Sequence, residues 1–369
     1  MKIVVVGAGI AGLSTAWQLV KRGHTVYLVE QAREIPNPLS ASGDQHRIIR
    51  RAYGGADGYA RNIDDAYAAW NEMWNDLGCK LVEDTGFLCV SQWPDDEADI
   101  YRQGLERGSY HCELFEPAEA ARRWPFLEEG TFRYAAFSRE GGVLFCQIIA
   151  RLLGKWISEH RGIVLKGARI KTIDTAAGKV RIAGGPEIEA DRVVVTAGAW
   201  VNELFPALAG TLVTYRTAVA YFEPPEDLAE VWMDAPVVLD IGGDADGYIL
   251  PPVAGCGLKF GTGHHRRPTG NPNAGRVPYE GEAEEIRARF SPPLARLDEY
   301  RPGEVVTCCY TFTEDEKFFA AREGRTLVVS ACSGHGYKFG AAVGRRVADA
   351  VESDDDGSLI RWLRAEQAG

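Results

Sequence analysis

Three glycines near the N-terminus stand between an apolar strand and a helix, and this arrangement limits the fold more than any other feature of the sequence. Residues 2–6 (KIVVV) predict a buried parallel strand. Gly7, Gly9 and Gly12 follow in the order G-x-G-x-x-G, and residues 10–22 have the apolar spacing of a helix. Together they predict the beginning of a doubly wound α/β sheet.

Each of these glycines has a physical task. Gly7 permits a tight turn, Gly9 lets a pyrophosphate approach the backbone, and Gly12 lets the helix pack closely on the strand. The helix N-terminus supplies N–H groups and a positive dipole for phosphate. Residues 25–30 predict the next strand, which ends at Glu30, where a carboxylate can bind ribose hydroxyls. The segment therefore predicts a site for FAD or NAD, and Glu30 disfavours NADP because it would repel a 2′-phosphate.

Two later apolar strands, at residues 192–196 and 327–331, run into glycines, and we expect both to join the first sheet. Residues 211–300 are rich in strands with proline and glycine between them. We therefore expect an α/β fold with two domains. The nucleotide domain is discontinuous, and a second domain is inserted into it. The expected ranges are 1–80, 141–210 and 301–369 for the first domain, and 81–140 and 211–300 for the second.

Helices are expected at four further places, and short strands at three. The helices are at residues 57–78, 143–160, near 281–290 and from about 338 onward. The strands are at residues 163–172, 179–183 and 187–196.

The composition is that of a globular protein, with 46% hydrophobic and 25% charged residues. A net charge of −11 argues against nucleic acid or an anionic membrane as a partner. The sequence contains neither an apolar run of membrane-spanning length nor a secretion signal. Its eight cysteines form no C-x-x-C pair, so we expect reduced thiols, a cytoplasmic location and no metal site.

Five short segments keep one order along nearly the whole chain. They are GAGIAG at 7–12, RIIR at 47–50, GCGLK at 255–259, TCCYT at 307–311 and SGHGYKF at 333–339. Together they resemble the monomeric sarcosine oxidase branch of the D-amino acid oxidase superfamily, which includes N-methyltryptophan oxidase and L-pipecolate oxidase. The resemblance implies a monomer with a Rossmann-like FAD domain and a substrate domain built on a mostly antiparallel sheet.

The resemblance assigns Arg50 and Lys338 to the carboxylate of an amino acid substrate. A guanidinium can grip a carboxylate with two parallel N–H bonds. Arg47 is a further catalytic candidate, and it would share a face with Arg50 if the segment were helical. Without the resemblance, Arg47, Arg50 and Arg51 would be interpreted as an exposed basic run, and Lys338 as a surface lysine after a strand.

Three other residues match active-site positions of the family. Lys259 matches a lysine beside the flavin that promotes reaction with oxygen, since a positive charge stabilises developing superoxide. The alternative for Lys259 is an edge-strand lysine that blocks aggregation. Tyr248 matches an active-site tyrosine, with a core aromatic as the alternative. His335 is either catalytic or a structural hydrogen-bonding residue.

The resemblance also implies that FAD is bound covalently. Cys308 matches the cysteine that bonds to the flavin 8α carbon, and Cys309 points to the other face of the expected strand. Tyr310 shares a face with Cys308 and is a candidate substrate contact, so we assign the linkage to Cys308. We expect Cys309 to be buried and inert. Further glycines resemble FAD contacts of the family, at Gly198, Gly334 and Gly336.

Three positions depart from the family pattern. His46 stands next to Arg47, whereas the family often has its histidine before the glycine of H-G-D-T-R-I-I-R. Gly263 takes the place of an active-site histidine, with His264 one position beyond it, and Glu314 replaces a proline. The first two changes lie near the expected substrate pocket, so the substrate need not be sarcosine.

The predicted reaction is FAD-dependent oxidation of the C–N bond of a small secondary amino acid, N-methylated or cyclic, to an imine. Oxygen is the acceptor and hydrogen peroxide the product. One alternative is a dehydrogenase of the same fold with another electron acceptor, which Lys259 disfavours. The other is a flavoprotein subunit of a larger complex, which the joint presence of Arg50, Lys259 and Lys338 disfavours.

Overall fold

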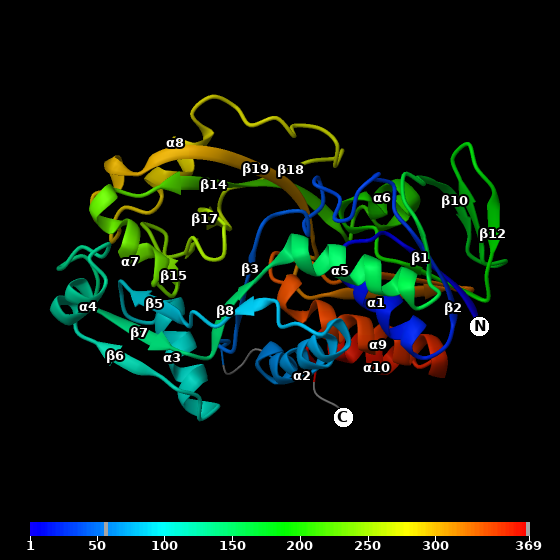
Figure 1. Cartoon of the computed structure of the whole chain (residues 1–369), viewed down its shortest axis with the longest axis horizontal. Coiled ribbons are helices and arrows are strands. Elements are labelled where there is room, and N and C mark those ends of the chain that lie inside the picture. The colour runs from blue at the N-terminus through cyan, green and yellow to red at the C-terminus, as the bar shows by residue number, and fades with distance from the viewer. Residues whose placement is uncertain (55–57, 367–369) are drawn as a thin grey trace.

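The computed structural model describes residues 1–54 and 58–366. Figure 1 shows two regions side by side, one with a six-stranded sheet and the N-terminus, the other with a nine-stranded sheet. A small sheet, in the order β3-β8-β4, connects them. Its strands are β3 (Arg47–Arg50), β4 (Val82–Glu83) and β8 (Gly141–Leu144).

Most strands of the six-stranded sheet are parallel, in the order β20-β21-β13-β1-β2-β9. Strand β20 runs antiparallel to β21. The pairing of β13 with β1 and of β21 with β13 confirms the prediction for residues 192–196 and 327–331. The strands are β1 (Lys2–Val6), β2 (Thr25–Val29), β9 (Ile163–Leu165), β13 (Arg192–Val195), β20 (Phe319–Glu323) and β21 (Thr326–Ser330).

Both faces of this sheet are buried, which explains why β1 is apolar at successive positions. Ile3 and Val5 face a core shared with a layer of helices, whereas Val4 and Val6 face a second core. The helical layer consists of α1 (Ile10–Lys21), α2 (Tyr59–Leu77), α5 (Cys146–Glu159), α9 (Gly340–Ser353) and α10 (Asp356–Leu363). The opposite face carries β10 (Ile170–Asp174), β11 (Lys179–Ile182), β12 (Glu187–Glu189) and α6 (Val201–Leu204).

The nine-stranded sheet has the order β18-β14-β17-β16-β15-β5-β7-β6, with β19 beside β14. Its pairs are antiparallel apart from β15 with β5. The strands are β5 (Phe87–Ser91), β6 (Glu113–Phe115), β7 (Tyr134–Ser138), β14 (Val213–Glu223), β15 (Val237–Ile241), β16 (Gly247–Leu250), β17 (Leu258–Thr262), β18 (Arg266–Pro268) and β19 (Arg301–Phe312).

Shorter elements complete the chain. The remaining helices are α3 (Glu97–Arg107), α4 (Pro117–Arg123), α7 (Ala229–Met233) and α8 (Glu282–Ala288). The 3₁₀ turns are η1 (Gly198–Trp200), η2 (Pro206–Leu208), η3 (Glu226–Leu228), η4 (Leu297–Glu299) and η5 (Tyr337–Phe339). Within the part of the chain that is described, no helix has the length and apolar character to cross a bilayer.

The structure differs from the sequence-based expectations at several element boundaries. The helix expected at 143–160 begins only at Cys146, because residues 141–144 pair with β3. The strands expected at 163–172 and 187–196 are each two strands in different sheets. Residue 57 of the helix expected at 57–78 lies outside the described residues. Strand β19 belongs to the large sheet, although residues 301–312 fall in a range expected for the nucleotide domain, and the domain boundaries stay a prediction.

Two helical glycines allow the effect of close helix packing on stability to be distinguished from the effect of helix propensity. A Cβ on Gly344 in α9 would lie 2.3 Å from the backbone carbon of Ser14 in α1, whereas one on Gly154 in α5 would meet the Ile35 side chain at 3.7 Å. We expect Gly344→Ala to lower the free energy of unfolding by about 1–3 kcal/mol, because α1 and α9 must separate. Gly154→Ala should raise it by about 0.5–1 kcal/mol. Urea unfolding measures both, and equal effects would contradict the close packing of these helices.

Candidate functional site

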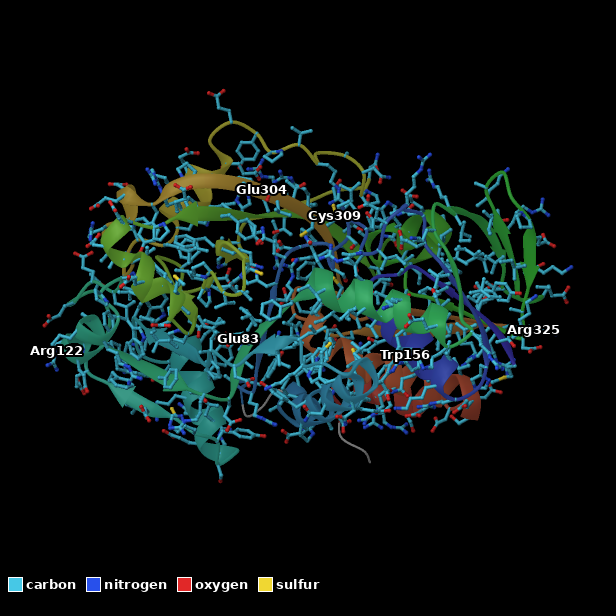
Figure 2. The ribbon with its side chains drawn as sticks, viewed as in Figure 1. Glu83, Arg122, Trp156, Glu304, Cys309 and Arg325 are labelled. Atoms are coloured by element: carbon cyan, nitrogen blue, oxygen red, sulfur yellow. The ribbon has the colours of Figure 1, made fainter. Side chains whose placement is uncertain are left out.

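A cavity of about 1280 Å³ lies where the two regions meet, and both sheets contribute to its walls. Figure 2 shows Cys309 near the middle of the molecule, on β19, where the large sheet reaches the region with the N-terminus. One end of the cavity is lined by the glycine turn after β1, and the other by β15, β16 and α3.

The glycine turn has the shape that the G-x-G-x-x-G pattern predicts. Gly7 has a φ of 98°, which glycine adopts without strain. A Cβ on Gly12 would lie 1.8 Å from the Gly7 carbonyl oxygen, so only glycine fits there. Helix α1 begins after Gly9, which has no side chain of its own to cap the helix, and the Ile10 N–H donates to the Ser42 hydroxyl instead (3.0 Å). The positive end of the helix dipole at this turn favours an anion.

Glu30, at the end of β2, is fixed beside this turn. Its carboxylate accepts hydrogen bonds from the backbone N–H of Ala8 (2.8 Å) and Ala32 (2.9 Å) and from the Asn37 amide (3.3 Å). Across the cavity wall, Gly198 follows β13 with a φ of 53°. A glycine turn, a helix N-terminus and a fixed carboxylate together fit the adenosine diphosphate half of FAD.

A buried carboxylate, Asp44, is the centre of a polar cluster just before β3. It accepts hydrogen bonds from the Tyr221 hydroxyl (2.6 Å), from Lys259 Nζ (3.1 Å) and from Arg47. Lys259 is fully buried and also donates to the His46 carbonyl. Because Tyr221 and Lys259 belong to β14 and β17, the cluster connects β3 to the large sheet.

The charges of this cluster depend on one another. Burial opposes the charge of Asp44, but Lys259 and Arg47 outweigh it and hold the pKa of this carboxyl well below its usual value. Burial lowers the pKa of Lys259, helped by Arg47, whereas Asp44 acts in the opposite direction. Burial and Asp44 raise the pKa of Tyr221. Asp44 is therefore ionised, and its charge opposes the effect of burial on Lys259.

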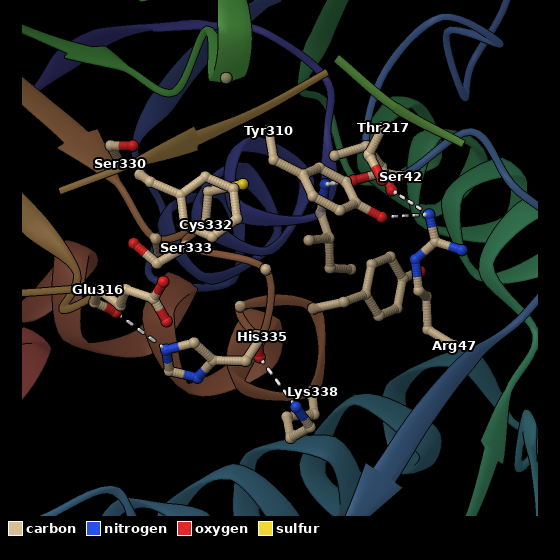
Figure 3. Close-up of a pocket in the computed structure, with 18 of the residues that line it drawn as sticks. Ser42, Arg47, Thr217, Tyr310, Glu316, Ser330, Cys332, Ser333, His335 and Lys338 are labelled. Carbon is tan, nitrogen blue, oxygen red and sulfur yellow. Dashed lines mark hydrogen bonds between the residues drawn. The ribbon is translucent and has the colours of Figure 1, made fainter. Parts of the chain in front are cut away.

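Strand β3 presents its two arginines to different parts of the cavity. Arg47 donates to the Tyr310 hydroxyl (3.2 Å), as Figure 3 shows, while Arg50 donates to the Tyr101 hydroxyl (2.9 Å). The Arg50 guanidinium also lies over the rings of Tyr101 (4.1 Å) and Tyr53 (5.1 Å). The segment is a strand and not a helix, so the expected common face of Arg47 and Arg50 is wrong: residues three apart on a strand point to opposite sides.

The turn η5 supplies a further basic side chain. Lys338 donates from Nζ to the His335 carbonyl (3.1 Å), and His335 Nε2 lies 3.2 Å from the Glu316 carbonyl oxygen. Figure 3 shows both side chains across the cavity from Arg47 and Tyr310. Burial and the charge of Lys338 lower the pKa of His335 to about 3, so its ring is neutral at pH 7.

The adjacent cysteines of β19 are both buried. Cys309 packs against Ala199 and Trp200 and belongs to the cavity wall. Cys308 is not part of that wall, although it shares a strand face with Tyr310, which is. Burial raises the pKa of the Cys308 thiol. The linkage of FAD to Cys308 thus stays a prediction that rests on the resemblance.

The cavity brings together every predicted site residue apart from Gly12 and Cys308. Those that line it are Gly7, Gly9, Glu30, Arg47, Arg50, Gly198, Tyr248, Lys259, Tyr310, Gly334, His335, Gly336 and Lys338. Strand β17 lies between β14 and β16, so the alternative of an edge-strand lysine for Lys259 is wrong.

Sequence reasoning missed four residues of this site. Asp44 has a signal, since it lies in the same short motif as Arg47. Tyr101, in an acidic helical segment, and Tyr221, in a long apolar strand, have none. Asp240 also lines the cavity, and the sequence VVLDIGG around it offers only a lone carboxylate between apolar residues.

Comparisons with known proteins agree with this site. The model of the family described as FAD dependent oxidoreductase (DAO) matches residues 2–350. Monomeric sarcosine oxidase of Bacillus sp. (strain B-0618) is 29% identical, covering 93% of this chain and 90% of that protein. N-methyl-L-tryptophan oxidase of Yersinia pestis (strain Pestoides F) is 26% identical, covering 93% and 92%.

Among solved structures, the open form of NikD, described as an unusual amino acid oxidase essential for nikkomycin biosynthesis, has the same fold. The TM-score is 0.80 at 19% identity, over 97% of this chain and 96% of that one. The relatives are those of the sarcosine oxidase branch that the five motifs predicted. The chain belongs to the family of FAD-dependent oxidoreductases.

Proposed function

We propose that the protein oxidises the C–N bond of a small secondary amino acid, N-methylated or cyclic, to an imine, with oxygen as acceptor and hydrogen peroxide as product. One observation carries this proposal: Arg50 and Lys338, distant in the sequence, line the same cavity as the glycine turn that fits FAD. The names of the relatives support it, since sarcosine and N-methyl-L-tryptophan are both N-methyl amino acids.

Arg50 is held in a geometry suited to a carboxylate. Hydrogen bonds to the Tyr101 hydroxyl and the Ala52 carbonyl fix its guanidinium, and the ring of Tyr53 lies beneath it. A guanidinium carries more N–H donors than these two bonds use, so a carboxylate can accept the others. Lys338, 7% exposed, adds a second positive charge to the cavity. Both charges favour the anionic end of an amino acid.

When bound, FAD supplies the hydride acceptor for this oxidation. The chain orients the substrate, because Arg50 and Lys338 fix its carboxylate and leave its amine to point along the cavity. The positive charges of Arg47 and Lys259 disfavour the ammonium form of that amine. The amine therefore releases its proton to solvent on binding, and its lone pair is available for the C=N bond. Water hydrolyses the imine.

Lys259 is the residue we propose for the reaction with oxygen. It is fully buried, lines the cavity and donates a hydrogen bond to the ionised Asp44. A fixed positive charge stabilises the anion that develops as electrons reach oxygen. We also propose a covalent bond from Cys308 to FAD, on the match of T-C-C-Y-T to the family.

We further propose a cytoplasmic monomer. The name of the relative monomeric sarcosine oxidase supports the oligomeric state. The eight cysteines, all free in the structure, suit a reducing compartment.

Stopped-flow measurement of the two half-reactions tests the proposed function. We expect Arg50→Ala to lower the kcat/KM for flavin reduction by an N-methyl amino acid about ten- to a hundred-fold, because a charge-assisted hydrogen bond contributes about 1.5–3 kcal/mol.

Lys259→Met should slow reoxidation by oxygen far more than it slows reduction, because it removes the positive charge.

The amide of the same amino acid is the control for the first variant. The wild type should use this neutral analogue poorly, and Arg50→Ala should discriminate against it much less. A wild-type flavin that no N-methyl or cyclic amino acid reduces would contradict the proposal. A flavin that is reduced but not reoxidised by oxygen would identify a dehydrogenase.

Acid precipitation tests the covalent linkage. The yellow colour should stay in the pellet for the wild type and for Cys309→Ser, and it should move to the supernatant for Cys308→Ser, because a thioether requires the Cys308 sulfur. Release by Cys309→Ser alone would move the linkage to the cysteine of the cavity wall. Release from the wild type would show that FAD is not covalent.

Urea unfolding tests the role of Asp44. We expect Asp44→Asn to lower the free energy of unfolding by about 3–5 kcal/mol, because Lys259 would stay buried without its counter-ion. Adding Lys259→Met should recover part of this loss. The control is Asp84→Asn, which breaks an exposed pair with Lys80 and should cost at most about 1 kcal/mol. Equal losses for Asp44→Asn and Asp84→Asn would contradict the central position of Asp44.

A further inference from the structure

A second buried carboxylate, Asp240, lines the cavity from strand β15 and takes no part in the reaction proposed above. It is 8% exposed. Its φ is 59°, a left-handed conformation that is uncommon for residues with a side chain and that is concentrated at functional sites. Aspartate adopts this conformation more readily than most residues do, but here it interrupts an otherwise apolar strand.

A β-bulge produces this conformation. Leu239 pairs with Tyr248 on β16, and Ile241 pairs with Gly247, so Asp240 is the extra residue between two consecutive pairs. A bulge of this kind redirects a side chain and commonly lies beside an active site. The ladder to β5 also stops at Leu239. The backbone is therefore built to turn the Asp240 side chain out of the regular alternation of the strand.

One oxygen of Asp240 has no partner. Among the described residues, Oδ2 is buried and accepts no hydrogen bond. Among these described residues, Asp240 and Arg50 form no ion pair within 4.0 Å. Burial raises the pKa of this carboxyl to about 8, although Arg50 and a hydrogen bond with Cys89 act in the opposite direction. A buried acceptor without a donor destabilises the protein unless a ligand donates the missing hydrogen bond.

We propose that Asp240 accepts a hydrogen bond from the side chain of the substrate, so that the enzyme selects amino acids with a hydroxyl or ammonium group there. This inference rests on the proposed function, in which Arg50 binds the carboxylate. Arg50 and Asp240 line the same cavity, so a substrate whose carboxylate is on Arg50 can present its side chain to Asp240. The walls around Asp240 include the apolar side chains of Ile100, Leu239 and Leu250. An apolar substrate would leave the carboxylate without a partner.

This environment determines how strongly Asp240 distinguishes a substrate with a donor group from one without it. A site that hydrogen-bonds a substrate group rejects the analogue without it, since its buried polar atom is then left unpaired. A hydrogen bond to a charged or buried acceptor changes affinity by about tenfold or more. Asp240 thus provides the selection between isosteric side chains. Arg50 and Lys338 cannot provide it, because they bind the carboxylate that all these substrates share.

Equilibrium binding of carboxylic acids that are not amino acid substrates tests this inference without turnover. The probes are two isosteric pairs, 3-hydroxypropionate with butyrate and 4-aminobutyrate with pentanoate, titrated into the FAD-loaded protein and followed by calorimetry. The wild type should bind at least one donor-bearing acid about tenfold or more tightly than its isostere. A preference only in the first pair identifies a hydroxyl, and only in the second an ammonium group.

Two variants separate recognition from support of the backbone. Asp240→Gly suits the left-handed φ and removes the carboxylate, so it should abolish the preference while the melting temperature stays the same or rises. Asp240→Asn keeps an acceptor oxygen, so it should keep a preference for the hydroxyl and lose one for the ammonium group. Ala254→Gly, at a φ of 48° and outside the cavity wall, controls for glycine at a left-handed position.

The outcomes distinguish this inference from the proposed function. Equal binding within both pairs by the wild type, no binding of any of the four acids, or an unchanged preference in Asp240→Gly overturns the role of Asp240. A lower melting temperature of Asp240→Gly with equal loss for all four acids makes Asp240 a structural partner of Arg50 and also overturns it. The proposed function fails separately, if no N-methyl or cyclic amino acid reduces the flavin.

Discussion

The cavity depends on one buried charge that needs partners. Asp44 is ionised inside the protein, and an ionised carboxylate without compensation there costs several kcal/mol. Arg47 comes from β3, whereas Lys259 and Tyr221 come from the large sheet. Satisfying this carboxylate therefore fixes the segment before β3 against the large sheet. The position of β3 between the two regions, and with it the separation of the cavity walls, follows from that requirement.

The same segment also reaches the dinucleotide end of the cavity. The Ser42 hydroxyl accepts a hydrogen bond from the Ile10 N–H (3.0 Å), at the beginning of α1. From Ser42 to Arg50 the chain thus runs from the glycine turn, past Asp44, to the arginine that we propose for the carboxylate. A shift of this segment would change the cofactor end and the substrate end together. The arrangement couples the two sites through one short stretch of backbone, which also explains why the motif around residues 47–50 can be recognised in sequence.

The sequence predicts those parts of the structure that local rules determine. The glycine turn, the first βαβ unit and the strands at 192–196 and 327–331 follow from spacing and apolar runs. The start of α5 does not, because residues 141–144 become a strand only through pairing with β3, which lies far away in the sequence. The strand at Arg47–Arg50 was missed for the same reason. Tyr221 reaches Asp44 through the register of a long strand, and Tyr101 reaches the cavity through the packing of a helix. Neither contact is visible in a single sequence.

Two buried carboxylates, one beside the cavity and one in its wall, show how environment separates roles. Asp44 accepts from three side chains and from the Gln45 N–H, and its pKa lies well below the usual value, whereas burial without sufficient donors raises the pKa of Asp240 to about 8. Environments that move the pKa values of like groups apart assign them different tasks. The paired carboxylate holds the structure together. The other, with Oδ2 buried and without a hydrogen bond, stands on a bulge with left-handed backbone, and backbone of this kind is concentrated at functional sites.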